Sequence, residues 1–152
     1  MKIAVASDHA GYEVKEALAG HLRAQGHDIE DYGCFDDSSC DYPDFAAAAA
    51  RGVASGAQEY GVMVCGTGLG VCMAANKIVG IRAAPVHDRT TAEMSRRHNN
   101  ANIVCLGARI TEKDVALDLV DLWLETPFEG GRHERRVGKI NALDDADCRQ
   151  QA

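Results

Sequence analysis

Residues 61–70 read Gly61-Val62-Met63-Val64-Cys65-Gly66-Thr67-Gly68-Leu69-Gly70, an apolar run followed at once by a glycine-rich loop. The apolar run predicts a short strand buried on both faces, because no polar residue alternates with the apolar ones. The glycines favour a tight turn into a short helix over Leu69–Lys77. A buried strand that turns directly into a helix is typical of a parallel α/β sheet.

Apolar runs and amphipathic stretches alternate along the rest of the chain. The spacing of Val14, Leu18 and Leu22 at i, i+4 and i+8 predicts a helix that ends at Gly26. Further helices are expected at Asp44–Ser55, Asp88–His98, from Thr111 onward and at Glu134–Asp145, and further strands, mostly buried on both faces, at Ile3–Ala6, Ile29–Tyr32, Ile81–Val86 and Ile103–Leu106. This alternation predicts a single-domain, doubly wound, Rossmann-like α/β fold: a five-stranded parallel sheet with helices on both faces.

The composition is that of a globular domain. With 152 residues, 46% hydrophobic and 26% charged, the chain is expected to form one domain over 1–152, with a loose tail from about 144 to 152. The net charge of −7 predicts no nucleic-acid partner and no binding to an anionic membrane. No stretch approaches the roughly 18 apolar residues of a membrane span, and the N-terminus lacks the apolar segment of a signal peptide.

The cysteines and histidines are scattered. The six cysteines contain no C-x-x-C pair, and the six histidines show no metal-ligand spacing. This pattern favours free thiols in the cytoplasm over a disulfide framework, and it predicts no metal site.

Ligands of doubly wound sheets bind outside the carboxyl ends of the strands. The polar residues that follow the predicted strands are therefore the candidates for a site. They are Ser7-Asp8-His9, Cys65 with the loop Gly66-Thr67-Gly68-Leu69-Gly70, His87-Asp88 and Gly107-Ala108-Arg109.

The glycine loop has two interpretations. Its backbone N–H groups and the following helix N-terminus could hold a phosphate or an oxyanion formed during a reaction, or the glycines could simply make a tight turn. It matches neither the G-x-G-x-x-G fingerprint nor Walker A. Cys65 is either a small buried hydrophobe or a thiolate, favoured by the helix N-terminus and by a hydrogen bond from Thr67, that acts as nucleophile or base.

The polar pair and the basic clusters also allow two interpretations. Asp8 could cap a helix beside a surface His9, or the pair could do acid–base work in the same crevice as Cys65. Arg96-Arg97-His98 favours a solvated basic helix end, although a histidine such as His98 suits proton transfer near neutral pH. Arg132 and Arg136, four residues apart after Gly130-Gly131, could clamp a phosphate or form a charged helix start with Glu134.

These motifs resemble the ribose-5-phosphate isomerase B family, which includes the galactose-6-phosphate isomerase subunits. The matching motifs are Ser7-Asp8-His9-Ala10-Gly11, Asp41-Tyr42-Pro43, Cys65 to Gly70, Ala74-Ala75-Asn76-Lys77, Gly80-Ile81-Arg82-Ala83, Ser95-Arg96-Arg97-His98-Asn99, Gly107-Ala108-Arg109 and Glu129-Gly130-Gly131-Arg132-His133. The resemblance implies an aldose–ketose isomerase that converts ribose 5-phosphate and ribulose 5-phosphate through a cis-enediolate, without metal or cofactor. Alternatives are the same chemistry on allose 6-phosphate, galactose 6-phosphate or a tetrose phosphate, a non-catalytic phosphosugar-binding module and, last, a cysteine-dependent hydrolase or phosphatase.

The resemblance also implies residue roles. Cys65 would be the base, with Thr67 supporting its thiolate and the N–H groups of the loop holding the enediolate oxygens. His98, with Asp8 nearby, would open the sugar ring. The remaining contacts to substrate would come from Gly66, Gly68, Leu69, Gly70, Asn99 and Tyr42, with His9, Arg109, Arg132 and Arg136 around the phosphate.

The same resemblance implies a homodimer or tetramer with shared active sites, in which the C-terminal helix packs on a partner subunit. The thiol, the glycine loop, the histidine and the arginines are all expected at the ligand-facing ends of the strands.

Overall fold

The computed structural model describes residues 1–150, and their side chains as far as Asp144. One five-stranded sheet forms the centre, with all neighbouring strands parallel and the order β2-β1-β3-β5-β4. The strands are β1 (Lys2–Ser7), β2 (Asp28–Asp31), β3 (Tyr60–Cys65), β4 (Ala83–Pro85) and β5 (Ile103–Gly107). The helices are α1 (Tyr12–Ala24), α2 (Tyr42–Ala54), α3 (Leu69–Ala75), α4 (Arg89–Arg97), α5 (Lys113–Glu125) and α6 (Arg132–Gln150). The predicted fold class is confirmed.

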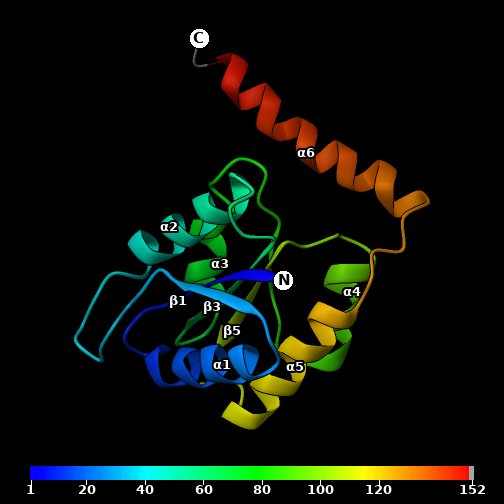
Figure 1. The fold of residues 1–152 in the computed structure, drawn as a ribbon. Helices are drawn as coiled ribbons and strands as arrows, with labels where there is room; N and C mark the ends of the chain where they lie inside the picture. Colours follow the sequence, from blue (N-terminus) through cyan, green and yellow to red (C-terminus); the bar gives the residue numbers. More distant parts are fainter. Residues whose placement is uncertain (151–152) are drawn as a thin grey trace.

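The helices cover the sheet in two layers. In Figure 1, α2 and α3 lie above the sheet, and α1 and α5 lie below it. The layer of α1, α4 and α5 buries Leu18, Leu22 and Trp123 against β1, β3 and β5. The layer of α2 and α3 is built from smaller residues, including three alanines of the Ala46–Ala50 run, and therefore packs close to the sheet.

The strand order creates one switch point. From β1 the chain moves to β2 on one side, and it then returns to place β3 on the other side of β1. At such a point the loops that follow the two central strands separate and leave a crevice at the carboxyl edge. The polar residues after β1 and β3 flank this crevice.

The two edge strands differ from the prediction. Side chains of β2 and β4 are exposed or half-buried, whereas those of β1, β3 and β5 are almost all buried. The prediction of burial on both faces is wrong for β2 and β4, because an edge strand has a neighbour on one side only. The run Ile81–Val86 forms a strand only over Ala83–Pro85.

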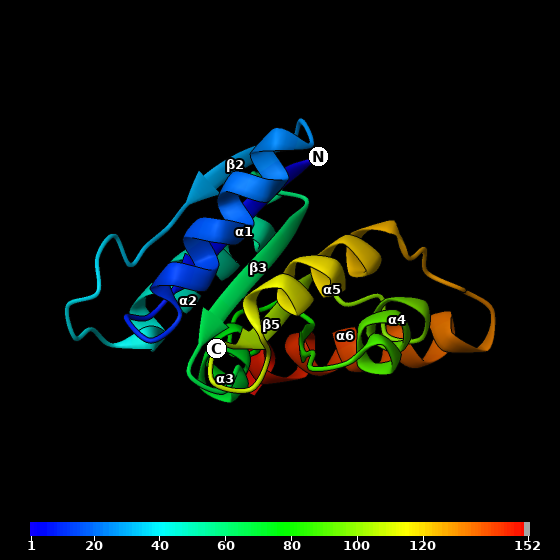
Figure 2. The ribbon, with the colours of Figure 1, turned by 90° about the horizontal axis from the view of Figure 1, so that it is seen from below.

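Helix α6 projects from the layered body (Figures 1 and 2). It starts two residues before the predicted Glu134 and continues past Asp145 to Gln150. The Gly80 N–H donates to Asp144 Oδ2 at 2.9 Å, while Ile140 and Leu143 stay exposed. The predicted tail, 144–152, lies partly outside the described residues. Within residues 1–150, no helix has the length and apolar character required to cross a membrane.

Candidate active site in two halves

The Cys65 sulfur lies at the switch point and accepts a backbone hydrogen bond. The Gly68 N–H donates to Cys65 Sγ at 3.1 Å. This geometry requires the left-handed conformation of Gly68, whose φ is 78°. The loop thus places a backbone donor directly at the sulfur.

The expected hydrogen bond from Thr67 to the sulfur is absent from the described residues. The Thr67 hydroxyl instead accepts from the Leu69 N–H at 3.4 Å. The backbone of the loop has taken the role that the sequence suggested for the side chain.

Four further candidates surround the same edge. Asp8 is buried and accepts from the Gly11 N–H at 3.0 Å, a hydrogen bond within the turn before α1, whose N-cap residue is Gly11. His9 Nδ1 accepts from the Cys40 N–H at 3.3 Å. The remaining two, Tyr42 and Arg109, flank the glycine loop. A β-carbon added to Gly70 would lie 2.8 Å from the Tyr42 ring, and one added to Gly66 would lie 3.3 Å from the Arg109 guanidinium. A cavity of about 400 Å³ adjoins Arg109.

These residues form the acceptor half of the candidate site, defined as Asp8, His9, Tyr42, Arg109 and Cys65 with its loop Gly66–Gly70. It combines the Arg109 guanidinium beside Gly66 and the buried Asp8 carboxyl with the Gly68 N–H at the sulfur. This arrangement can hold an oxyanion near a sulfur base.

The other candidates lie at the opposite edge of the sheet. Helix α4 runs back from the carboxyl edge, so His98 and Asn99 follow its end beside the amino ends of β4 and β5. Strand β5 is five residues long and separates the two edges by about 13 Å. All candidates were expected at the ligand-facing carboxyl ends of the strands. Within one chain this expectation is wrong for His98, Asn99, Arg132 and Arg136.

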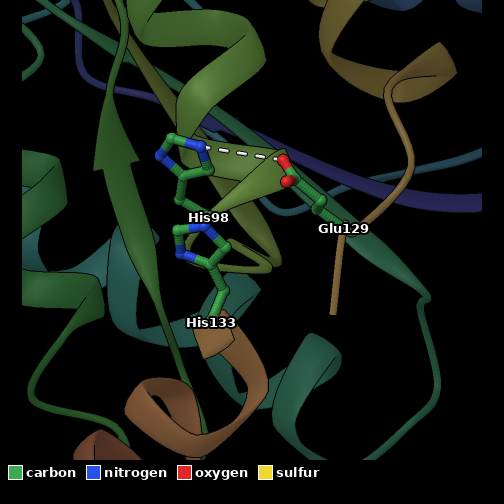
Figure 3. Close-up of side chains that lie close together, drawn as sticks. All are labelled: His98, Glu129 and His133. Atoms are coloured by element: carbon green, nitrogen blue, oxygen red, sulfur yellow. Dashed lines mark ion pairs between the residues drawn. The ribbon is translucent and has the colours of Figure 1, made fainter. Parts of the chain in front are cut away.

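This second group forms the basic half, defined as His98, Asn99, Arg132, Arg136 and two residues that no role was predicted for, Glu129 and His133. Figure 3 shows the rings of His98 and His133 stacked, with centroids 4.1 Å apart and planes 3° from parallel. The Glu129 carboxylate lies 3.8 Å from His98 Nε2. Arg132 and Arg136 lie one turn apart at the start of α6.

The charge of the basic half suits an anion better than a cation. Burial, then the charges of His98 and Arg132, lowers the pKa of His133. Ligand atoms of His98, Glu129 and His133 lie within 4.8 Å of one another, which is close enough to consider a metal ion. However, Arg132 Nε already donates to His133 Nε2 at 3.2 Å, so this lone pair is occupied and a second cation would be repelled.

The end of α4 is solvated at Arg97, as its sequence favoured, but not at Arg96. Arg96 is 5% exposed and packs over the rings of Tyr60 and Trp123. No local sequence pattern indicated this burial, because both aromatic partners are far away in the chain. For Glu129 and His133 a signal existed, since both belong to the motif around Gly130-Gly131.

Comparisons with known proteins identify relatives of this chain. A family model described as Ribose/Galactose Isomerase matches residues 3–140, a range that contains both halves. Ribose-5-phosphate isomerase B of Escherichia coli K12 is 39% identical over 143 residues, which cover 94% of this chain and 96% of the relative.

Solved structures of two further relatives superpose over nearly the whole chain. Ribose-5-phosphate isomerase B of Clostridium thermocellum has a TM-score of 0.95 and 48% identity, covering 96% of this chain and 99% of that one. Ribose-5-phosphate isomerase B of Mycoplasma genitalium, solved with bound ribulose 5-phosphate, has a TM-score of 0.91 and 41% identity, covering 95% and 96%.

Proposed function

The chain belongs to the Ribose/Galactose Isomerase family and is an aldose–ketose isomerase, and we propose that it interconverts D-ribose 5-phosphate and D-ribulose 5-phosphate through a cis-enediolate. The observation that carries this proposal is Cys65 at the switch point, with its sulfur held by the Gly68 N–H at 3.1 Å. An isomerase needs one base that moves a proton between two adjacent carbons and donors that hold the charged oxygens.

In the proposed mechanism the acceptor half performs the proton transfer. The Cys65 thiolate removes the C2 proton of the open-chain aldose and returns it to C1, while the proton of the C2 hydroxyl passes to the C1 oxygen, so that C2 becomes the carbonyl carbon. The backbone N–H groups of Gly66–Gly70 hold the enediolate oxygens, which develop charge as the proton leaves. Tyr42, packed against Gly70, bounds the sugar, and His9 and Arg109 bind the phosphate.

The basic half opens the sugar ring before that step. His98 donates a proton to the ring oxygen while Asp8 of the acceptor half takes the proton of the anomeric hydroxyl, so that C1 becomes the aldehyde carbon. The Glu129 carboxylate lies 3.8 Å from His98 Nε2. Asn99 binds a sugar hydroxyl. Arg132 and Arg136 bind the phosphate, and the hydrogen bond between Arg132 and His133 orients the first of them.

A complete site requires two copies of the chain. The separation of the halves by the length of β5 supports a homodimer, in which the basic half of one protomer faces the acceptor half of its partner. Helix α6 carries exposed Ile140 and Leu143 away from the body, which supports its packing on the partner. Because the five cysteines with described side chains are free thiols, we also propose a reducing compartment, the cytoplasm.

The test is a coupled assay of ribose 5-phosphate conversion with EDTA present. Replacing the base, Cys65→Ala, should lower kcat by roughly 10²- to 10⁴-fold, the range for a lost general base. The matched control is Cys72→Ala, because the Cys72 thiol is also buried but points to the Ala83 carbonyl at 3.4 Å.

The outcomes separate reaction class from residue role. A Cys65→Ala enzyme with most of its rate would contradict the assigned base and leave the reaction class intact. A parent protein that converts no ribose 5-phosphate would contradict the proposed substrate, and the same assay would then be run with six-carbon and four-carbon sugar phosphates.

A further inference from the structure

A buried arginine lies directly before the turn that carries His98 and Asn99. Arg96 is 5% exposed, and none of the side chains described through Asp144 forms an ion pair with it. Burial lowers its pKa, while Tyr60 acts in the opposite direction. An apolar residue would fill this place without the cost of desolvating a guanidinium, so the charge and its donors call for another explanation.

The guanidinium is satisfied by aromatic rings and oxygen atoms. It lies 4.9 Å from the ring centre of Tyr60 and 5.2 Å from that of Trp123. It donates to the Tyr60 hydroxyl at 3.2 Å and to the Thr126 carbonyl at 3.3 Å. These contacts fix the guanidinium to β3 and to the end of α5, two rigid parts of the core.

The other side of the same guanidinium holds the turn. Arg96 Nη1 donates to Asn100 Oδ1 at 3.0 Å and to the Ala101 carbonyl at 2.7 Å. Asn100 has a φ of 46°, the left-handed conformation that reverses the chain after α4. The turn is therefore attached to the core through Arg96 immediately after His98 and Asn99.

A second arginine holds the same turn from outside. Arg82 Nε donates to the carbonyls of Asn99 and Asn100, each at 3.2 Å, and Arg82 Nη1 donates to Asn141 Oδ1 of α6 at 3.0 Å. Burial and the charge of Arg96 lower the pKa of Arg82, as expected for two neighbouring guanidiniums. Carbonyls of one short turn thus keep two mutually repelling cations in place.

We propose that Arg96 is a positioning residue for ring opening: it fixes the turn of residues 98–101 so that His98 and Asn99 meet a sugar bound by the acceptor half of the partner. The proposal rests on the proposed function, because His98 acts only if the substrate is a cyclic sugar phosphate. Arg96 itself touches no substrate. Its forked donors, which a lysine cannot reproduce, make the effect specific to arginine.

The test separates ring opening from proton transfer. Ribulose 5-phosphate has no ring, so exchange of its C1 hydrogen with solvent deuterium, followed by NMR, needs Cys65 but not His98. Arg96→Lys should lower kcat for ribose 5-phosphate about 10- to 100-fold, while exchange at saturating ribulose 5-phosphate stays within about threefold of the parent. The matched control is Arg97→Lys, because the Arg97 side chain is exposed, and it should change neither rate.

A second variant guards against a folding defect in Arg96→Lys. Asn100→Gly tolerates the left-handed φ and removes only the Oδ1 acceptor of Arg96. It should lower ribose 5-phosphate turnover about 3- to 10-fold and leave exchange unchanged.

Three results would overturn the inference. In the first, both variants turn over ribose 5-phosphate at the parent rate. In the second, turnover and exchange fall by the same factor, as general structural damage would cause. A parent that catalyses neither reaction would reject the proposed function itself, and the positioning role with it.

Discussion

In the basic half, the protonation state of His133 determines whether its Nε2 can accept the hydrogen bond from Arg132. Its Nε2 lone pair receives the Arg132 Nε–H, which requires an unprotonated nitrogen there. Burial, His98, Arg132 and Arg136 all lower the pKa of His133, and Glu129 alone raises it. The imidazole is therefore less protonated than a free histidine, whose pKa is near 6.5, at the same pH.

This balance predicts opposite shifts in two variants. Glu129→Gln removes the only raising charge and should lower the His133 pKa further, whereas Arg136→Gln removes a lowering charge and should raise it. Below about pH 6.5 the unfolded chain binds a proton at this histidine that the folded chain does not bind. The free energy of unfolding therefore decreases as the pH is lowered, until His133 is protonated in the folded chain as well. NMR titration of the histidine ring protons measures both shifts, with His87 at the far end of α4 as internal control. Shifts of the same sign in both variants would contradict the assignment of charges.

Local sequence patterns predicted the position of residues whose surroundings come from neighbouring sequence. Cys65 and its glycine loop could be predicted because strand, turn and helix start are contiguous. Arg96 could not, since its partners Tyr60 and Trp123 come from other elements. The dipole argument predicted a solvated end, and packing against two aromatic rings outweighed it.

At the level of elements, the start of α1 is pressed against β3. A β-carbon on Gly11 would lie 2.6 Å from the Val64 carbonyl oxygen, the residue before Cys65. Backbone cannot rotate away as a side chain can, so α1 must shift outward if this position gains a methyl group. Gly20, in the middle of the same helix, has no atom within 4 Å of an added β-carbon.

The two glycines make a matched pair. Gly11→Ala should destabilise by roughly 1–3 kcal/mol and lower Tm by about 4–10 °C. It should also reduce isomerase activity, because the Gly11 N–H holds Asp8. Gly20→Ala should raise Tm by about 2–3 °C, since alanine favours the helix over glycine. Thermal unfolding of both variants checks the pair, and equal Tm values would refute the close approach of α1 to β3.

Periodicity predicted the strand and helix order, because each element carries its own pattern of apolar residues. It failed on the burial of β2 and β4. The run at 81–86 is apolar apart from Arg82, whereas the run at 29–32 already carries the carboxylates of Glu30 and Asp31. Only the strand order shows that both strands have one neighbour. Helix α6 was expected to be shorter, since its polar stretch after Leu143 offers no apolar face to follow.

For the whole molecule, the decisive fact is the distance between the two halves. Counting polar residues after strands located Asp8, Cys65 and Arg109 on one edge. The same reasoning could not place His98, because a residue that ends a returning helix lies at the amino edge. In the proposed dimer, the two half-sites of one chain are completed when a second copy turns its opposite edge toward the first.

Complementation between two inactive variants tests this arrangement. Cys65→Ala lacks the base, and His98→Gln lacks the ring-opening acid, so each homodimer should convert ribose 5-phosphate poorly. In a hybrid dimer one site combines the intact Cys65 of one protomer with the intact His98 of its partner, while the other site carries both substitutions. Hybrids isolated through two different tags should therefore recover about half of the parent activity per dimer. If both halves acted within one chain, each protomer of the hybrid would keep its own defect and no activity would return.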